Sequence, residues 1–149
     1  MNDLTIYQEK ILVLANENKK SVAIEEFNYS FDMKNPMCGD EVKVRINIID
    51  NKIVNISALV RGCALCEASA GLVVKTFNQN NFPKNNFIEN FKKWLNDSNL
   101  DLPDDLPKEI EVFMPIREIS NRHNCIVMPF EATMKSIEKL IIENNINQE

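Results

Sequence analysis

The stretch EVKVRINIIDNKIVNISALVRG, residues 41–62, contains two runs in which apolar and polar residues alternate. Successive side chains of a strand point to opposite faces, so this period of two is typical of strands with one buried face. Asp50 and Asn51 between the runs supply turn residues, and we therefore predict an antiparallel hairpin over 41–61. Its buried face is predicted to carry Val42, Val44, Ile46 and Ile48 from the first strand and Val54, Ile56, Ala58 and Val60 from the second.

Directly after the hairpin the period changes to that of a helix. From Ala64 onward, one helical stripe carries Cys66, Ala70, Val73 and Phe77. Residues 17–33 show no clear pattern. Further helical patterns cover 4–16, a short segment with Phe87, Phe91, Trp94 and Leu95, the range Ile110–Ile119, and a last helix with Phe130, Met134, Ile137 and Ile141. We expect the last helix to begin near Cys125 to Pro129, because proline is tolerated in a first turn.

These elements predict an α+β fold, in which helices pack on one face of a small antiparallel sheet with the hairpin 41–61 at its centre. The 149 residues are expected to form one domain, 1–149. A formal net charge of −5 argues against binding to nucleic acid or to an anionic membrane. The N-terminus lacks the pattern of a signal peptide, and no apolar run approaches the length of a membrane span. We therefore expect a cytoplasmic location.

In a reducing compartment, cysteines are more often free thiols, metal ligands or catalytic groups than disulfides. Cys63 and Cys66 form a Cys-x-x-Cys pattern, which raises the alternative of a thiol oxidoreductase. However, Cys66 lies on the apolar stripe, where burial should raise the pKa of its thiol and make it unreactive. Cys63 lies where a strand gives way to a helix, and the helix dipole should stabilise its thiolate. The two cysteines therefore belong to different environments.

The remaining two cysteines also lie at the starts of predicted elements. Cys38 precedes the first strand of the hairpin together with Gly39 and Asp40, and Cys125 precedes the last helix. Three thiolates and one carboxylate suffice for a tetrahedral zinc ion, although the spacing is not that of a zinc finger. A shared metal site, a redox cysteine pair and a structural zinc domain that binds a partner all remain open at this point.

Two residues close to Cys125 have more than one interpretation. His123 is a candidate ligand, although a single histidine beside a site is more often a bystander. Arg122 either hydrogen-bonds a sulfur, contacts a partner protein or simply faces solvent.

The segments NPMCGDEVKVRINI (35–48), DNKIVNI (50–56), GCALCEASA (62–70) and RHNC (122–125) together resemble the IscU, SufU and NifU N-terminal family of iron–sulfur cluster assembly proteins. The order of the motifs and their placement on elements match across most of the chain. Two features resemble the SufU branch in particular: the long segment between Cys63 and Cys125, and Arg122 three residues before Cys125. Cys66 departs from the family pattern, which has serine at this position. A cysteine there introduces two further alternatives: an additional metal ligand, or an internal disulfide with Cys63.

The resemblance implies a metal site made of Cys38, Asp40, Cys63 and Cys125, commonly occupied by Zn²⁺ in the SufU branch. It implies a pyridoxal-phosphate-dependent cysteine desulfurase of the SufS type as partner, with Cys38 as the acceptor of persulfide sulfur. In IscU proteins the acceptor corresponds to Cys125. As an alternative function, Cys38, Cys63 and Cys125 would hold a transient [2Fe–2S] cluster on a scaffold that serves apoproteins or downstream assembly factors.

Overall fold

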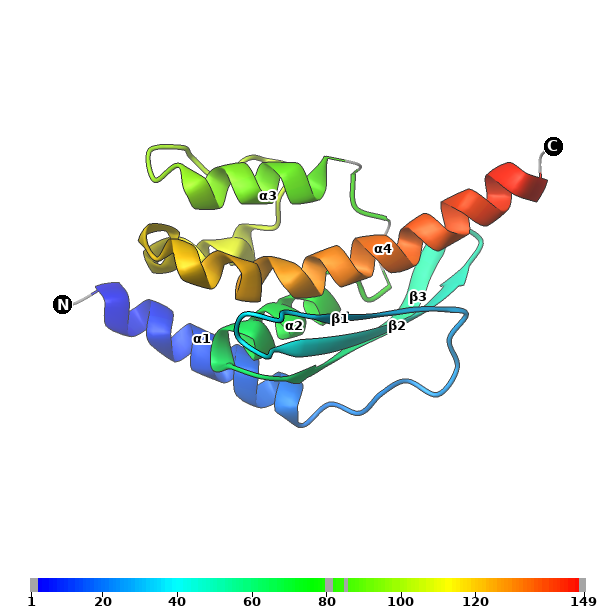
Figure 1. Cartoon of the computed structure of the whole chain (residues 1–149), viewed down its shortest axis with the longest axis horizontal. Coiled ribbons are helices and arrows are strands. Elements are labelled where there is room, and N and C mark those ends of the chain that lie inside the picture. Colours follow the sequence, from blue (N-terminus) through cyan, green and yellow to red (C-terminus); the bar gives the residue numbers. More distant parts are fainter. Residues whose placement is uncertain (1–2, 80–81, 85, 148–149) are drawn as a thin grey trace.

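The computed structural model describes residues 3–79, 82–84 and 86–147. In chain order its elements are α1 (Asp3–Lys19), β1 (Tyr29–Lys34), β2 (Glu41–Ile49), β3 (Lys52–Arg61), α2 (Ala64–Phe77), α3 (Phe87–Asn96), the 3-10 segments η1 (Lys108–Glu118) and η2 (Ser120–Arg122), and α4 (His123–Asn147). Figure 1 shows the long helix α4 lying along the sheet, with α3 on its outer side. The predicted α+β fold with an antiparallel sheet is confirmed.

The sheet has the strand order β1-β2-β3, and both pairs are antiparallel. The first strand of the predicted hairpin, β2, is therefore the central strand. Asp50 and Asn51 form the turn with φ values of 54° and 62°, which match the right-handed twist of a tight hairpin. Strand β1 was not predicted, because its side chains are only half-buried or exposed and its sequence therefore shows no clear alternation.

The second strand of the hairpin differs from the predicted alternation at its start. Ile48 pairs with Ile53 and Asn47 pairs with Asn55, so Val54 is an extra residue on β3. Such a bulge shifts the phase of the strand by one residue. Ile53 is therefore fully buried and Val54 is 41% exposed, which corrects the prediction that Val54 faces the core. Beyond the bulge, Ile56 and Ala58 are buried as predicted.

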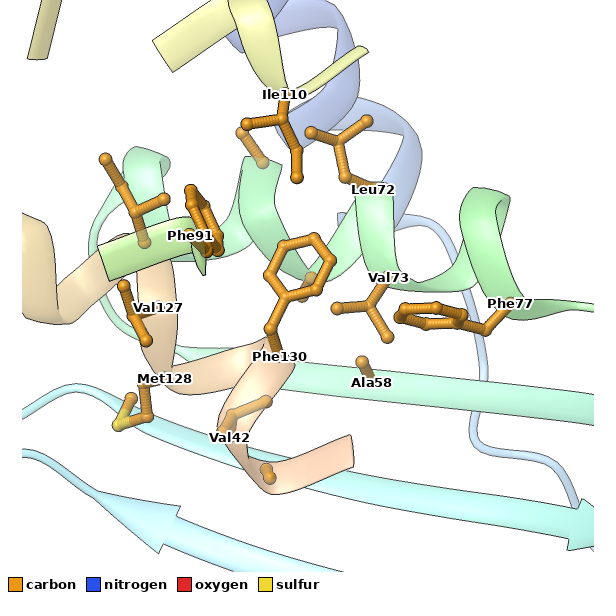
Figure 2. Close-up of a cluster of buried hydrophobic side chains, with 14 of the residues drawn as sticks. Val42, Ala58, Leu72, Val73, Phe77, Phe91, Ile110, Val127, Met128 and Phe130 are labelled. Carbon is orange, nitrogen blue, oxygen red and sulfur yellow. The ribbon is translucent and has the colours of Figure 1, made fainter. Parts of the chain in front are cut away.

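The core lies between the sheet and the helices α2 and α4 (Figure 2). Phe130 of α4 is its centre, with ring centroids 5.3 Å from Phe91, 5.5 Å from Phe87 and 6.1 Å from Phe77. These aromatic contacts join α4 to both α3 and α2, so one side chain links three helices. The predicted apolar stripe of α2 is buried along its whole length.

Helix α4 begins earlier than the sequence indicated. Its first residue is His123, and Pro129 lies inside the helix rather than in the first turn. Proline has no N–H, so the carbonyl of Cys125 lacks the donor that residue 129 would provide in a regular helix. At the other end, Ile141 is exposed although its stripe is apolar, because the last turns extend past the core (Figure 1).

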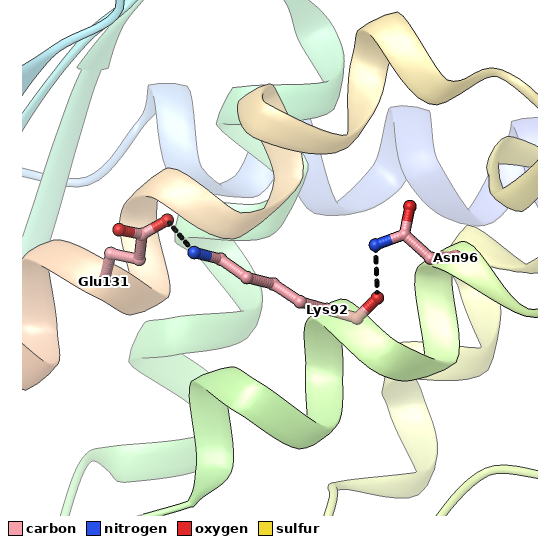
Figure 3. A network of polar contacts seen from close by, with 3 residues as sticks. All are labelled: Lys92, Asn96 and Glu131. Atoms are coloured by element: carbon pink, nitrogen blue, oxygen red, sulfur yellow. Dashed lines mark hydrogen bonds and ion pairs between the residues drawn. The ribbon is translucent and has the colours of Figure 1, made fainter.

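Helix α3 is attached to α4 mainly by buried side chains. Phe91 and Trp94 are fully buried, whereas the ion pair between Lys92 Nζ and Glu131 Oε1 spans 3.6 Å at the surface. Figure 3 shows this pair, together with Asn96, whose amide donates to the carbonyl of Lys92 at 2.9 Å. Exposed ion pairs contribute at most about 1 kcal/mol, so apolar burial dominates the docking of α3.

No helix in the described ranges is both long enough and apolar enough to span a membrane.

The bulge in β3 gives a direct test of the sheet. Replacing Ile53 by alanine should lower the free energy of unfolding by about 2–5 kcal/mol, because it leaves a cavity in the core. The adjacent change Val54→Ala should cost less than about 1 kcal/mol, because that side chain faces solvent. Urea denaturation of both variants measures the two values. The reverse order would mean that the uninterrupted alternation is correct and the bulge is not.

Candidate metal centre

Cys38 lies on a tight turn between β1 and β2. The amide of Gly39 donates to the carbonyl of Asn35 at 2.7 Å, and the amide of Asn35 donates to the carbonyl of Asp40 at 2.8 Å. Gly39 has a φ of 79°, a conformation that favours glycine because a side chain there is strained. This turn leaves Cys38 exposed and places Asp40 at the start of β2.

Asp40 connects this turn to the beginning of α2. Its carboxylate is buried, with Oδ1 accepting the backbone N–H of Cys63 at 3.0 Å and Oδ2 lying 3.4 Å from the Cys63 sulfur. Gly62 makes this approach feasible: a Cβ at residue 62 would lie 2.7 Å from Cγ of Asp40 and closer still to Oδ1. The glycine before Cys63 is therefore required by the position of the carboxylate.

Three of the predicted site residues have potential metal-ligand atoms close to one another. Cys38, Asp40 and Cys125 have ligand atoms within 4.8 Å of one another, and the sulfurs of Cys38 and Cys125 are 3.8 Å apart. Cys63 is not part of this trio but reaches it through Asp40. The four residues come from the β1–β2 turn, the start of β2, the β3–α2 junction and the first turn of α4. The fold thus brings together all four residues that the sequence singled out.

The carboxylate and the thiols influence one another's protonation. Burial raises the pKa of Asp40, but hydrogen bonds from Cys125, from Cys38 and from the N–H and thiol of Cys63 outweigh it, so the pKa is lowered overall. Burial, followed by the hydrogen bond to Asp40, raises the pKa of Cys125 well above its usual range. Asp40 is therefore ionised and accepts hydrogen bonds from the thiols, and a bound cation would instead favour their thiolate forms.

Cys66 is separated from this group. It is fully buried in α2, and burial, followed by the negative charge of Asp40, raises the pKa of its thiol. The prediction that Cys66 packs in the core is confirmed.

The structure also decides between the interpretations of His123. Its ring is buried, and Nε2 lies 3.1 Å from the carbonyl oxygen of Ile116 and 3.0 Å from that of Arg117. Carbonyl oxygens only accept hydrogen bonds, so this geometry assigns the proton to Nε2. Among the described residues, the ligand atoms that lie within 4.8 Å of one another are those of Cys38, Asp40 and Cys125, and neither ring nitrogen of His123 joins that group. Arg122 is exposed at the end of η2.

Two residues that the sequence did not single out form buried hydrogen bonds in the segments close to Cys125. Arg117 is buried in η1, and its Nε donates to the carbonyl of Trp94 at 2.8 Å. The hydroxyl of Ser69 on α2 donates to the carbonyl of Ile126 in the first turns of α4. The available sequence signal for Arg117 is that it directly follows the apolar run VFMPI, residues 112–116. Ser69 gave no signal of its own.

Three thiols and a carboxylate lie close together on this α+β scaffold, and such a group of side chains is typical of proteins with a cysteine-based metal site. The chain belongs to the NifU-like N terminal domain family, whose sequence pattern matches residues 6–100. That range contains Cys38, Asp40 and Cys63, and Cys125 lies beyond it.

Individual relatives agree with this assignment. The chain is 22% identical over 136 residues to the iron–sulfur cluster assembly scaffold protein IscU of Thermotoga maritima, covering 91% of this chain and 94% of that protein. Two crystal structures share the fold. A NifU-like protein (N-terminal) from Brucella abortus has a TM-score of 0.70 at 19% identity, covering 89% of this chain and 92% of that one. A putative SUF-system scaffold protein, SufU, from Fervidobacterium islandicum has a TM-score of 0.71 at 20% identity, covering 91% and 98%.

The contrast between the four thiols can be measured by alkylation of metal-free protein with iodoacetamide. Cys38 should react fastest because it is exposed, and Cys66 should react at least about 100-fold more slowly because it is buried with a raised pKa. Peptide mass spectrometry gives the rate for each cysteine, and the denatured protein serves as the control in which all four react. Comparable rates for Cys63 and Cys66 would restore the redox Cys-x-x-Cys interpretation.

Proposed function

We propose that this protein serves iron–sulfur cluster assembly as a zinc-bearing acceptor of persulfide sulfur from a cysteine desulfurase. The observation that carries the proposal is the exposed thiol of Cys38, 3.8 Å from the buried thiol of Cys125 and beside the buried carboxylate of Asp40. Membership of the NifU-like family and the similarity to the Thermotoga maritima scaffold protein support the same biological process.

The donor set fits a zinc ion. Two thiolates bound to one tetrahedral zinc at about 2.3 Å lie about 3.8 Å apart, and the sulfurs of Cys38 and Cys125 have that separation. A thiolate and a carboxylate oxygen on the same ion lie about 3.6 Å apart, close to the 3.4 Å between Cys63 Sγ and Asp40 Oδ2. Cys38, Asp40, Cys63 and Cys125 would therefore hold the ion, which would keep the thiols deprotonated and protect them from oxidation.

Cys38 is the residue best placed to accept sulfur. It is the exposed cysteine of the four and lies on a turn, so a partner can reach its sulfur without opening the core. Its thiolate attacks the outer sulfur of the desulfurase persulfide. A new S–S bond forms on Cys38, the S–S bond on the desulfurase breaks, and the desulfurase cysteine leaves as a thiolate. The exchange needs no external oxidant or reductant.

A second function uses the same residues. As a scaffold, the protein would assemble a [2Fe–2S] cluster on Cys38, Cys63 and Cys125 and pass it to apoproteins or downstream assembly factors. The IscU relative from Thermotoga maritima is named a scaffold, which favours this candidate. In that case Cys125 is the alternative sulfur acceptor. The burial of Cys66 argues against a thiol oxidoreductase, and the exposure of Cys38 argues against a closed structural zinc site.

Metal content tests the four-residue site. Elemental analysis of anaerobically purified, tag-free protein should find about one zinc per chain. Alanine at Cys38, Asp40, Cys63 or Cys125 should lower that content, because each change removes one ligand. Cys66→Ala is the matched control and should keep it. Full zinc retention in both Cys38→Ala and Cys125→Ala would contradict a shared site.

Sulfur transfer tests the role of Cys38. After incubation with a SufS-type desulfurase and L-cysteine, mass spectrometry should find one added sulfur on Cys38, which a reductant such as dithiothreitol removes. Cys38→Ser should abolish the added sulfur, and Cys66→Ser should leave it unchanged. Sulfur found on Cys125 instead, with a [2Fe–2S] absorption spectrum after anaerobic addition of ferrous iron, would favour the scaffold over the carrier.

A further inference from the structure

The imidazole of His123 joins the start of α4 to the end of η1. His123 is 8% exposed, and its Nε2–H points at the carbonyls of Ile116 and Arg117, 3.1 Å and 3.0 Å away. Both carbonyls lie in the last turn of the 3-10 helix η1, and that of Ile116 also accepts the N–H of Ile119 at 2.9 Å. The histidine therefore provides a hydrogen bond between two elements that sequence periodicity treats as separate.

The end of η1 is itself fixed by Arg117. Its guanidinium lies 4.4 Å above the ring of Trp94. It donates hydrogen bonds to the carbonyl of Trp94 in the last turn of α3 and to the carbonyls of Asp97 and Leu100, which follow that helix. A cation at the C-terminal end of a helix also complements the helix dipole. Because these bonds are buried or half-buried, the carbonyls that His123 contacts belong to a rigid frame.

The start of α4 depends on such external contacts. Pro129 deprives the Cys125 carbonyl of its regular helical donor, so the turn that carries the cysteine is less supported by its own helix. His123 holds this turn against η1, and Ser69 holds it against α2 through the carbonyl of Ile126. Cys125 lies two residues after His123, between these two points of attachment.

We propose that His123 is a positioning residue, whose Nε2–H bond to the η1 carbonyls fixes Cys125 so that its sulfur lies beside that of Cys38. The consequence for metal binding rests on the proposed function. The placement of Cys125 is independent of it, because it can be measured in metal-free protein. In this role His123 is not a metal ligand, because its ring nitrogens lie outside the group of ligand atoms formed by Cys38, Asp40 and Cys125. It is also not a bystander, whose removal would leave Cys125 unchanged.

The test uses two amide replacements that differ in where they place an N–H group. Glutamine extends its amide to about the position of Nε2, whereas asparagine reaches only about as far as Nδ1. His123→Gln should therefore preserve the bond, and His123→Asn should lose it. Asn124→Gln, at the exposed position between His123 and Cys125, controls for general disturbance of the turn.

The first measurement is the alkylation rate of Cys125 in metal-free protein. It should stay at the wild-type value in His123→Gln and Asn124→Gln and rise about tenfold in His123→Asn. Cys66 should remain protected in every variant, which distinguishes local displacement of Cys125 from unfolding. An unchanged rate in His123→Asn, a rise in His123→Gln equal to that in His123→Asn, or an equal rise for Cys66 and Cys125 would each overturn the proposal.

The second measurement is the visible absorption of the Co²⁺-substituted protein, in which thiolate ligands give charge-transfer bands. Wild type and His123→Gln should share one spectrum, and His123→Asn should lose intensity as Cys125 withdraws. If wild type binds no Co²⁺, the proposed metal site fails, and the alkylation rates still decide whether His123 positions Cys125.

Discussion

The buried carboxylate of Asp40 is the contact on which the arrangement of this site depends. Placing a carboxylate in the interior is costly unless hydrogen bonds compensate for the lost water. Here the compensation comes from the first N–H at the start of α2 and from the surrounding thiols, and the positive end of the helix dipole adds to it. One side chain thereby sets the start of β2 against the start of α2, with Gly62 leaving the room that a Cβ would fill. The base of the hairpin and the helix that follows it form a single unit for this reason.

The sequence was informative wherever a local period decides the structure. Every second residue from Val42 to Ile48 is apolar and buried, as predicted. The helical stripe through Cys66 is also buried as predicted. The predicted alternation failed at Val54, because an apolar pattern does not show where a strand carries an extra residue. The side chain of Asn28 pairs with both backbone groups of Ile48, accepting its N–H at 2.9 Å and donating to its carbonyl at 2.6 Å. Asn28 lies in a segment without any periodic signal, so alternation alone did not predict this contact beside the bulge either.

The candidate site shows the same division. Cys38, Asp40, Cys63 and Cys125 were identifiable because each stands at the start of an element and because the motifs around them resemble one family. Their mutual distances were not, since Cys38 and Cys125 are separated by 87 positions in the chain. The contacts of Arg117 near the end of η1 could not be predicted from the sequence either. Arg117 acts through backbone carbonyls, and a carbonyl acceptor leaves no trace in the pattern of side chains.

The unequal exposure of the thiols bears on the choice between sulfur carrier and scaffold. Cys125 and Asp40 are buried and held by neighbouring elements, whereas Cys38 lies exposed on a turn whose conformation depends on Gly39. Buried donors keep their geometry when a partner approaches, and an exposed donor on a turn can leave and return at lower cost. A carrier needs Cys38 to leave the group while sulfur is transferred, and a scaffold needs it to remain while a cluster is built. Either function would therefore depend on one equilibrium, the position of residues 35–39 relative to the buried carboxylate of Asp40 and the buried thiol of Cys125. A desulfurase that binds this turn would favour the open arrangement, and iron or zinc bound to all the donors would favour the closed one.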